Sequence, residues 1–283
     1  MLTVAAIQYC AGDDAAKTLA HIRPMIAKAA ETARLVTLPE AATYLAASRE
    51  QLAERAEWED DSLSQRSLSS CARDFDIWLL AGSLLLRRRD SGKLVNRSLL
   101  LAPDGHIAAS YDKIHMFDAD VGDGQTYRES ASFDAGNVPT IAQIDDMPTG
   151  MTICYDLRFP HLYRQLAQDG ARLLLVPAAF TATSGQAHWH VLLRARAIET
   201  GCFVVAPAQS GIHADGRKTF GHSLIISPWG EILADAGDGD AVIHAALDQN
   251  AVLQARQSIP SLATNPEIRP TKIVRHKAVR NAG

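Results

Sequence analysis

The sequence has few cysteines, and none of them forms a Cys-x-x-Cys pair. This spacing argues against a zinc site, a thioredoxin-like redox motif and a disulfide scaffold. Unpaired thiols are typical of a reducing compartment, so we expect a cytoplasmic protein. The four cysteines are widely scattered along the 283 residues: Cys10, Cys71, Cys154 and Cys202.

Long hydrophobic runs and a strong charge bias are also absent. No apolar run is long enough to cross a bilayer, and the first eight residues lack a basic segment and resemble a strand more than a signal peptide. The net charge is −4, from 28 basic and 32 acidic residues. We therefore expect neither a membrane nor a nucleic acid as a partner.

Several familiar catalytic and cofactor motifs are missing. Gly221-His-Ser223 lacks the second glycine of a serine-hydrolase elbow, and Gly122-Asp-Gly124 lacks the third glycine of a dinucleotide fingerprint. No HxxxH pair or strand-borne HxH pair accompanies a carboxylate, so we expect no metal site and no cofactor. The histidines that could suggest a metal cluster are His115, His188, His190 and His222.

What is present is an alternation of strand-like and helix-like segments, which predicts layered α/β architecture in one domain. We expect strands at 2–8, 35–38, 77–86, 94–101, 107–111, 149–153, 173–177, 202–206 and 242–247, and helices at 18–33, 63–74, 162–168 and 188–199. A loop-rich stretch is expected from 116 to 137. We place the domain at 1–262 and a basic C-terminal tail at 263–283, with Arg269, Lys272, Arg275, Lys277 and Arg280.

A thiol ends one of these strands. Cys154 follows an apolar stretch and is followed at once by polar residues, so it is expected at a turn where backbone N–H groups can face the sulfur. Taken alone, such a cysteine is more often packing material than a nucleophile. The rest of the chain has to decide between the two interpretations.

Two further polar residues end predicted strands. Glu40 follows Val-Thr-Leu-Pro, and Lys113 follows Ser-Tyr-Asp. Strand ends line the ligand crevice of layered α/β folds, so these residues and Cys154 are candidates to meet there. A carboxylate can take the thiol proton, and an ammonium can stabilise an oxyanion, which fits covalent acyl transfer. The alternative is that both are solvated surface charges.

These motifs resemble those of the nitrilase (carbon–nitrogen hydrolase) superfamily. The matching segments are Leu-Pro-Glu40, Tyr-Asp-Lys113-Ile-His-Met-Phe-Asp and Ile-Cys154-Tyr-Asp-Leu-Arg-Phe-Pro, in the family's order. The resemblance implies a four-layer α-β-β-α sandwich, with Glu40 as general base, Lys113 as oxyanion stabiliser and Cys154 as nucleophile. It further implies that Glu129 orients Lys113 or positions the substrate, and that subunits pair through the helices after Cys154 and around 190–200, giving a homodimer or larger assembly.

Segments 187–200 and 221–230 are similar to the branch of deaminated-glutathione amidases and omega-amidases. The resemblance implies hydrolysis of a primary amide of a small carboxylate-bearing substrate to acid and ammonia, through a cysteine thioester. Deaminated glutathione is favoured, and an omega-amide of a keto acid, an N-carbamoyl amino acid and a nitrile remain open. His161 and His190 replace the branch's usual glutamates, which changes local pairing and leaves the exact substrate open. A catalytically silent scaffold is disfavoured because all three motif residues are present.

Two residues after the thiol are candidates for substrate contact. The backbone N–H of Tyr155 is a candidate second oxyanion donor. Arg158 is a candidate to bind a substrate carboxylate, since a guanidinium can hold one bidentately. An ion pair of Arg158 with Asp156 or with a neighbouring element is the competing interpretation.

Overall fold

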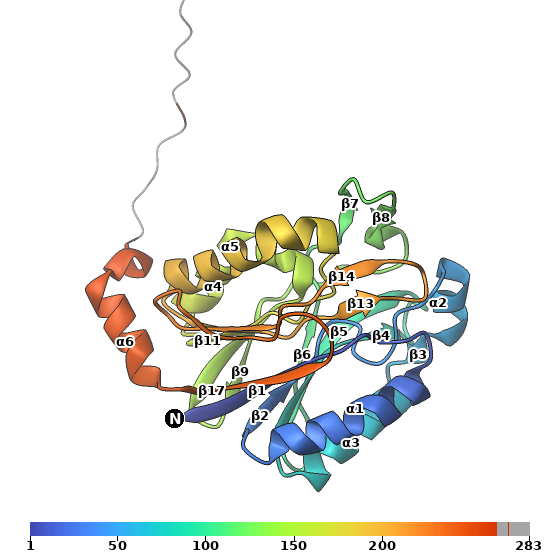
Figure 1. The fold of residues 1–283 in the computed structure, drawn as a ribbon, viewed down its shortest axis with the longest axis horizontal. Coiled ribbons are helices and arrows are strands. Elements are labelled where there is room, and N and C mark those ends of the chain that lie inside the picture. The colour runs from blue at the N-terminus through green and yellow to red at the C-terminus, as the bar shows by residue number, and fades with distance from the viewer. Residues whose placement is uncertain (265–270, 272–283) are drawn as a thin grey trace, which may run out of the picture.

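Two β-sheets pack against each other at the centre of the computed structural model, and helices cover their outer faces (Figure 1). The structure describes residues 1–264 and residue 271. The four layers form the α/β sandwich that the resemblance implies, which confirms the predicted fold class. The cationic residues of the predicted basic tail lie outside the described residues.

The first sheet has the strand order β17-β1-β2-β4-β5-β6, with the short β3 paired to β4. The strand β1 runs parallel to β2 and antiparallel to β17. Helices α1 (Ala15–Ala30) and α3 (Leu63–Asp74) pack on its outer face. The strands are β1 (Leu2–Gln8), β2 (Leu35–Thr37), β3 (Glu57–Trp58), β4 (Trp78–Arg87), β5 (Leu94–Leu101), β6 (Ile107–Asp112) and β17 (Ala241–Leu247).

The second sheet has the order β16-β15-β12-β11-β10-β9. Its outer face is covered by α4 (Pro160–Gln168) and α5 (Ala182–Thr200). Its parallel centre, β10-β11-β12, is flanked by antiparallel strands. The strands are β9 (Thr140–Ile144), β10 (Met147–Met151), β11 (Leu173–Leu175), β12 (Phe203–Ala206), β15 (Leu224–Ile226) and β16 (Ile232–Asp235).

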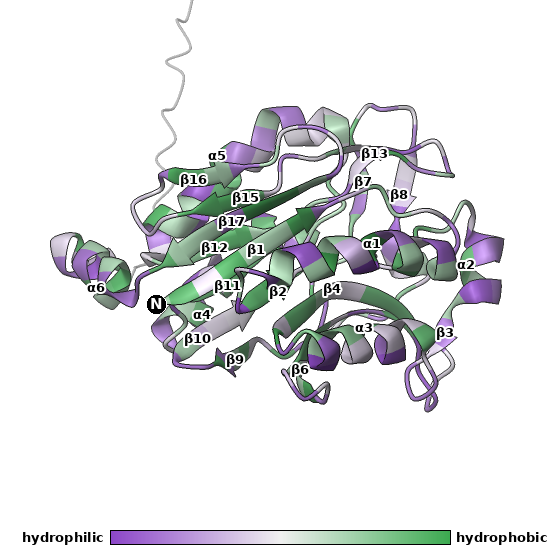
Figure 2. Cartoon of the chain, turned by 60° about the horizontal axis from the view of Figure 1, so that its bottom comes forward, coloured by the Kyte–Doolittle hydropathy of each residue, from purple (hydrophilic) through white to green (hydrophobic). Residues whose placement is uncertain are grey.

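Both faces of the central strands are buried, which explains their nearly continuous apolar sequences. In β1, Val4 and Ala6 pack between the sheets, whereas Ala5 and Ile7 pack under the helices. Successive side chains of a strand point to opposite faces, so one apolar run serves two cores. Figure 2 shows mainly hydrophobic strands at the centre and helices of mixed hydropathy around them. No helix in the described part of the chain is long and apolar enough to span a membrane.

The structure shifts or adds several elements. The helix expected at 18–33 occupies 15–30, because Asp14 caps it by accepting from the Lys17 N–H. The stretch expected as loop from 116 to 137 contains a small hairpin, and a second hairpin lies before β15. The elements that the sequence pattern did not predict are α2 (Arg49–Arg55), α6 (Gln249–Ser258), β3, β9, β7 (Asp118–Asp120), β8 (Thr126–Arg128), β13 (Ser210–Ile212) and β14 (Lys218–Phe220).

Candidate active site

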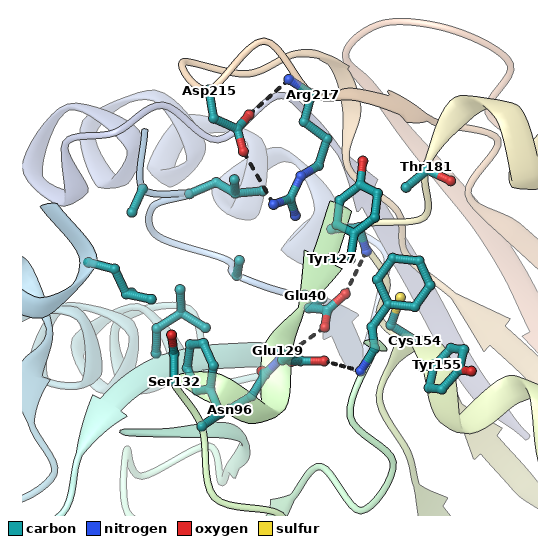
Figure 3. A pocket seen from close by; sticks show the side chains of 18 of the residues that line it. Glu40, Asn96, Tyr127, Glu129, Ser132, Cys154, Tyr155, Thr181, Asp215 and Arg217 are labelled. Atoms are coloured by element: carbon teal, nitrogen blue, oxygen red, sulfur yellow. Dashed lines mark hydrogen bonds and ion pairs between the residues drawn. The ribbon is translucent and has the colours of Figure 1, made fainter. Parts of the chain in front are cut away.

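Three strand ends deliver polar side chains to one cavity of about 300 Å³. Glu40 follows β2 and Lys113 follows β6, both in the first sheet, whereas Cys154 follows β10 of the second sheet. All three residues line the cavity, and so does Glu129. The structure thus brings together the four residues that the sequence singled out, although 114 positions separate the first from the last. Figure 3 shows Glu40, Glu129 and Cys154 among them.

A close backbone approach positions Glu40. Its neighbour Ala41 has φ +53°, and the Ala41 N–H donates to Ser83 Oγ at 2.9 Å. A Cβ atom on Gly82 would lie 1.9 Å from the Leu38 carbonyl oxygen and 2.6 Å from Cβ of Pro177. Only a glycine fits there, and it sits where the register of β4 and β5 shifts. This bulge lets the Glu40 loop close over the sheet.

Lys113 lies between two carboxylates and is almost fully buried. Its Nζ donates to Glu40 Oε1 at 2.8 Å and to Glu129 Oε2 at 2.9 Å. Glu129 is fixed in turn by the Phe117 N–H, which donates to Oε2 at 2.7 Å. The ammonium is therefore held in place from two sides.

Asn96, on β5, is a site residue that sequence reasoning missed. Its Nδ2 donates to Glu40 Oε1 at 2.9 Å and to Glu129 Oε1 at 3.0 Å, so one amide links both carboxylates. The sequence offered one signal for it, a polar residue within the apolar run Leu94–Leu101.

Cys154 sits in a strained backbone conformation. Its φ is +46°, in the left-handed region that non-glycine residues rarely adopt, and its N–H donates to the Pro177 carbonyl at 2.9 Å. A short 3₁₀ helix, Cys154–Arg158, begins at the thiol. The expected strand 149–153 ends two residues early, at Met151, so the thiol follows an extended connection.

Burial and charge set the protonation of this cluster. Burial raises the pKa of the Cys154 thiol well above its ordinary value, and the Glu40 carboxylate raises it further, whereas Lys113 opposes both. Burial alone would raise the pKa of Glu40, but the charge and hydrogen bond of Lys113, together with the Ala179 N–H and the neighbouring thiol, outweigh burial and lower that pKa. Burial lowers the pKa of Lys113, yet Glu129 and Glu40 raise it well above its usual range. The resting cluster therefore holds a protonated Cys154 thiol, an ionised Glu40 and a Lys113 ammonium.

A buried carboxylate connects the lysine and cysteine segments. Asp156 accepts from Tyr111 Oη at 2.7 Å, from the His115 N–H at 3.0 Å and from the Ile153 N–H at 2.9 Å. Asp156 therefore does not pair with Arg158. Arg158 instead contacts His188 of α5, Nη1 to Nδ1, at 3.2 Å.

The cavity wall combines aromatic and cationic side chains. Tyr155 and Arg158 both line it, as the sequence analysis anticipated. Arg217, from the β13–β14 hairpin, was not anticipated. Its Nη2 lies 3.2 Å from Asp215 Oδ2, its guanidinium lies 5.2 Å from the Tyr127 ring centroid, and its buried Nε has no hydrogen-bond partner. Figure 3 shows Arg217 and Asp215 across the cavity from Cys154.

The two histidines that replace the expected glutamates lie outside this cavity. His161 is exposed at the start of α4 and packs edge-on against His115 and Phe159. His190 pairs with Asp235 of β16. The Arg194 Nε, for its part, donates to the Gly230 carbonyl at 2.8 Å.

The fold and the clustered carboxylates, ammonium and thiol together define a hydrolase of carbon–nitrogen bonds. The carbon-nitrogen hydrolase family model matches residues 3–257. The chain belongs to this family and is an amidase, as the sequence motifs predicted.

Similar proteins with known names also belong to this family. The chain is 44% identical over 233 residues to a deaminated glutathione amidase of Synechocystis, covering 81% of this chain and 85% of that one. It is 36% identical over 234 residues to the human omega-amidase NIT2, covering 82% and 83%. The structure of Saccharomyces cerevisiae Nit3, a nitrilase-superfamily member, aligns with a TM-score of 0.83 at 28% identity, covering 92% and 94%.

Proposed function

We propose that Cys154 is the nucleophile, Glu40 the general base and Lys113 the oxyanion-stabilising residue, with Glu129 holding Lys113. The observation that carries this proposal is the position of Glu40 beside both partners in one cavity. Its Oε1 accepts from Lys113 Nζ at 2.8 Å, and its carboxylate is near enough to the Cys154 thiol to raise the thiol pKa. Because the thiol pKa is raised, the proton has to leave as the sulfur attacks, and an adjacent base serves that step.

The acylation step uses all of these groups, and Glu40 acts in it twice. Sγ of Cys154 forms a bond to the amide carbon while its proton moves to Glu40. The carbonyl electrons move to oxygen, where Lys113 and the Tyr155 N–H stabilise the oxyanion. As the tetrahedral intermediate collapses, Glu40 gives the proton to the leaving nitrogen, the carbon–nitrogen bond breaks and the amine departs.

The deacylation step mirrors the first. Glu40 takes a proton from water, and the resulting hydroxide adds to the thioester carbon. Collapse of the second tetrahedral intermediate breaks the carbon–sulfur bond and releases the acid. Glu40 returns the proton to the departing thiolate. Its lowered pKa keeps it ionised between the two steps, ready to accept a proton each time.

The substrate class we propose is an amide that carries a carboxylate. Arg217 supports it, because its side chain lines the cavity, where Asp215 and Tyr127 contact the guanidinium, and a guanidinium can bind a substrate carboxylate through paired hydrogen bonds. Arg158 is a second cationic residue in the cavity wall, and its guanidinium contacts His188.

Within this class we propose deaminated glutathione as the substrate, after the relatives of that name, with an omega-amide of a keto acid as the alternative. The two differ in the leaving group. The omega-amide is a primary amide and releases ammonia, which is the product expected from the sequence. In deaminated glutathione the amide joins the keto acid to cysteinylglycine, so the leaving group is a dipeptide amine. The cavity of about 300 Å³ extends as far as Arg49 and Leu52 of α2, which leaves room for a substituent beyond the scissile bond.

A substrate panel tests the proposal. Purified protein is given deaminated glutathione, α-ketoglutaramate, an N-carbamoyl amino acid, a simple nitrile and an aliphatic amide without a carboxylate, and both free amine and ammonia are measured. We expect turnover of the first compound above all others and none in Cys154→Ala. Turnover retained in Cys154→Ala contradicts the nucleophile, and preference for the nitrile or the carbamoyl compound contradicts the substrate.

Arg217 gives this panel a specificity control. Arg217→Gln is expected to raise KM for the carboxylate-bearing amide about 10- to 100-fold, the value of a charge-assisted hydrogen bond, with a smaller change in kcat. The same variant is expected to leave the aliphatic amide unaffected, and Arg217→Lys to recover part of the loss. An equal effect on both amides contradicts carboxylate recognition by Arg217.

We further propose a cytoplasmic hydrolase domain at 1–262 that assembles as a homodimer. Support for the location comes from Cys10, Cys71, Cys154 and Cys202, all of which are free thiols. Support for assembly comes from exposed apolar side chains on and beside α5, namely Val191, Ile198 and Trp229. Sedimentation of wild type and of a Val191→Glu/Ile198→Glu variant tests this, and an unchanged mass contradicts the interface.

A further inference from the structure

Two histidines and an aspartate converge on the side of the molecule covered by α5. His190 comes from α5, His222 from the turn before β15, and Asp235 from the end of β16. Their ligand atoms, one from each residue, all lie within 4.8 Å of one another. None of the three lines the catalytic cavity.

The His–Asp separations are slightly shorter than those around a tetrahedral metal ion, and all separations within the group are at most 4.8 Å. His190 Nε2 lies 3.1 Å from Asp235 Oδ2, and His222 Nδ1 lies 2.9 Å from Oδ1 and 3.2 Å from Oδ2. Zinc bonds of 2.0–2.2 Å at tetrahedral angles place neighbouring ligand atoms about 3.3–3.5 Å apart. Small side-chain adjustments are therefore enough to seat an ion.

The three side chains are held in place before any ion arrives. The Gly237 N–H donates to Asp235 Oδ1 at 2.9 Å. His222, at φ +51°, donates its N–H to the Gly237 carbonyl and accepts from Trp189 Nε1 at 2.7 Å. Its ring stacks on Phe220, with ring centroids 4.7 Å apart. Such outer contacts orient ligands and favour binding.

We propose that His190 Nε2, His222 Nδ1 and the Asp235 carboxylate form a binding site for a divalent transition-metal ion of the zinc type. Imidazole and carboxylate ligands in this number suit zinc, with water at the fourth position. The side chains are 27–33% exposed in the single chain. A bound ion ties α5 to β16, and α5 also carries the cavity residue Ser184 and the Arg158 contact His188.

This proposal departs from the sequence-based prediction of no metal site. The ligands lie at positions 190, 222 and 235, in three separate elements, so no local spacing reveals them. His190 stands where a glutamate was expected from the resemblance, and it supplies the imidazole that completes the cluster.

Cobalt titration of the full chain tests the site, because four-coordinate Co²⁺ reports its own geometry by visible ligand-field absorption. Wild type is expected to bind one Co²⁺ per chain, displaced by Zn²⁺, and to gain thermal stability with either ion. His190→Gln, His222→Gln and Asp235→Asn are each expected to weaken binding at least about tenfold. Circular dichroism of each variant shows that it is folded.

Three controls separate this site from other groups. His188→Gln alters a histidine two residues earlier on α5, and His21→Gln removes an exposed histidine–aspartate pair elsewhere; both are expected to bind Co²⁺ as wild type does. Cys154→Ala removes the catalytic thiol and is also expected to retain binding. The proposal is overturned if binding is absent in wild type, persists in His190→Gln, or disappears in Cys154→Ala.

Discussion

Lys113 and Glu129 form a two-point ion pair, in which Nζ lies 2.9 Å from Oε2 and 3.1 Å from Oε1. Glu129 thereby holds the ammonium through both of its carboxylate oxygens. The second carboxylate, Glu40, contacts the same ammonium at 2.8 Å. The two glutamates therefore have different roles. Glu129 holds the ammonium of Lys113 in place, whereas Glu40 also lies next to the Cys154 thiol.

The first prediction concerns Glu129→Gln. Loss of this negative charge removes the largest influence that raises the pKa of Lys113, and it frees the ammonium to move. We expect kcat to fall about 10²-fold, the scale of losing one oxyanion donor, with little change in KM. Steady-state kinetics measure both. Glu129→Asp, which keeps the charge, is the matched control and should lose less; equal losses in the two variants would argue against an electrostatic role.

The second prediction concerns the pH dependence of Cys154. Burial and Glu40 raise the pKa of the thiol and Lys113 lowers it, so Glu40→Gln removes one of the two raising influences and leaves Lys113 opposed by burial alone. The thiol pKa falls, and the thiolate forms at lower pH. We expect faster iodoacetamide labelling of Cys154 at pH 7–8, whereas amidase turnover falls about 10²- to 10⁴-fold.

Mass spectrometry of the labelled peptide from pH 6 to pH 10 measures the labelling midpoint. The midpoint in wild type should lie above the ordinary cysteine value of 9.0, and it should move down in the variant. Cys10, whose pKa is raised mainly by burial, is an internal control and should label at the same rate in both proteins. A midpoint that stays in place would show that Glu40 does not face the thiol.

The third prediction concerns Asp156→Asn. The carboxylate oxygens accept from Tyr111, His115 and the Ile153 N–H in a fully buried position. An asparagine has one acceptor oxygen, so its amide hydrogens would face donors. We expect the free energy of unfolding to fall by about 2–4 kcal/mol, measured by urea denaturation. Asp112→Asn is the comparison, because Asp112 is less buried and its partner Arg97 also binds Glu59. This variant should lower the free energy of unfolding by less.

The fourth prediction concerns Gly82→Ala. The added Cβ would lie 2.5 Å from the Pro39 carbonyl oxygen as well as 1.9 Å from that of Leu38, so the backbone before Glu40 has to move. We expect a stability loss of about 3 kcal/mol, together with a strong loss of turnover. Gly12→Ala is the control, because its nearest neighbour would be at an ordinary 3.8 Å. Unchanged kinetics in Gly82→Ala would show that the loop tolerates displacement.

Sequence reasoning recovered much of the fold because apolar periodicity is a strong signal. The strands at 2–8 and 94–101 and the helix at 63–74 have the predicted bounds. It also recovered Glu40, Lys113, Cys154 and Glu129 as one cluster, since each belongs to a segment that matches the family. The proximity of Glu40, Lys113 and Cys154 followed from the rule that strand ends share a crevice, whereas Glu129 was placed with them by the resemblance alone.

The other site residues could not be predicted, because their roles depend on contacts between distant parts of the sequence. Asn96 looked like a polar interruption of a strand, and its two carboxylate partners are 56 and 33 residues away. Arg217 lies in a hairpin of two short strands, which periodicity does not detect. The hydrogen bonds of Asp156 join two motifs 41–45 residues apart, so its competing assignment to Arg158 was wrong.

Glu40 and Lys113 extend from one sheet and Cys154 from the other, with a consequence for refolding. A chain in which either sheet has formed alone holds half of the cluster, and its thiol lacks both the burial and the neighbouring charges that raise its pKa. During refolding, the recovery of amidase activity therefore reports when the two sheets pack together, whereas circular dichroism reports when the β-structure forms. A delay of activity behind the circular dichroism signal would measure how long formed sheets remain unpacked.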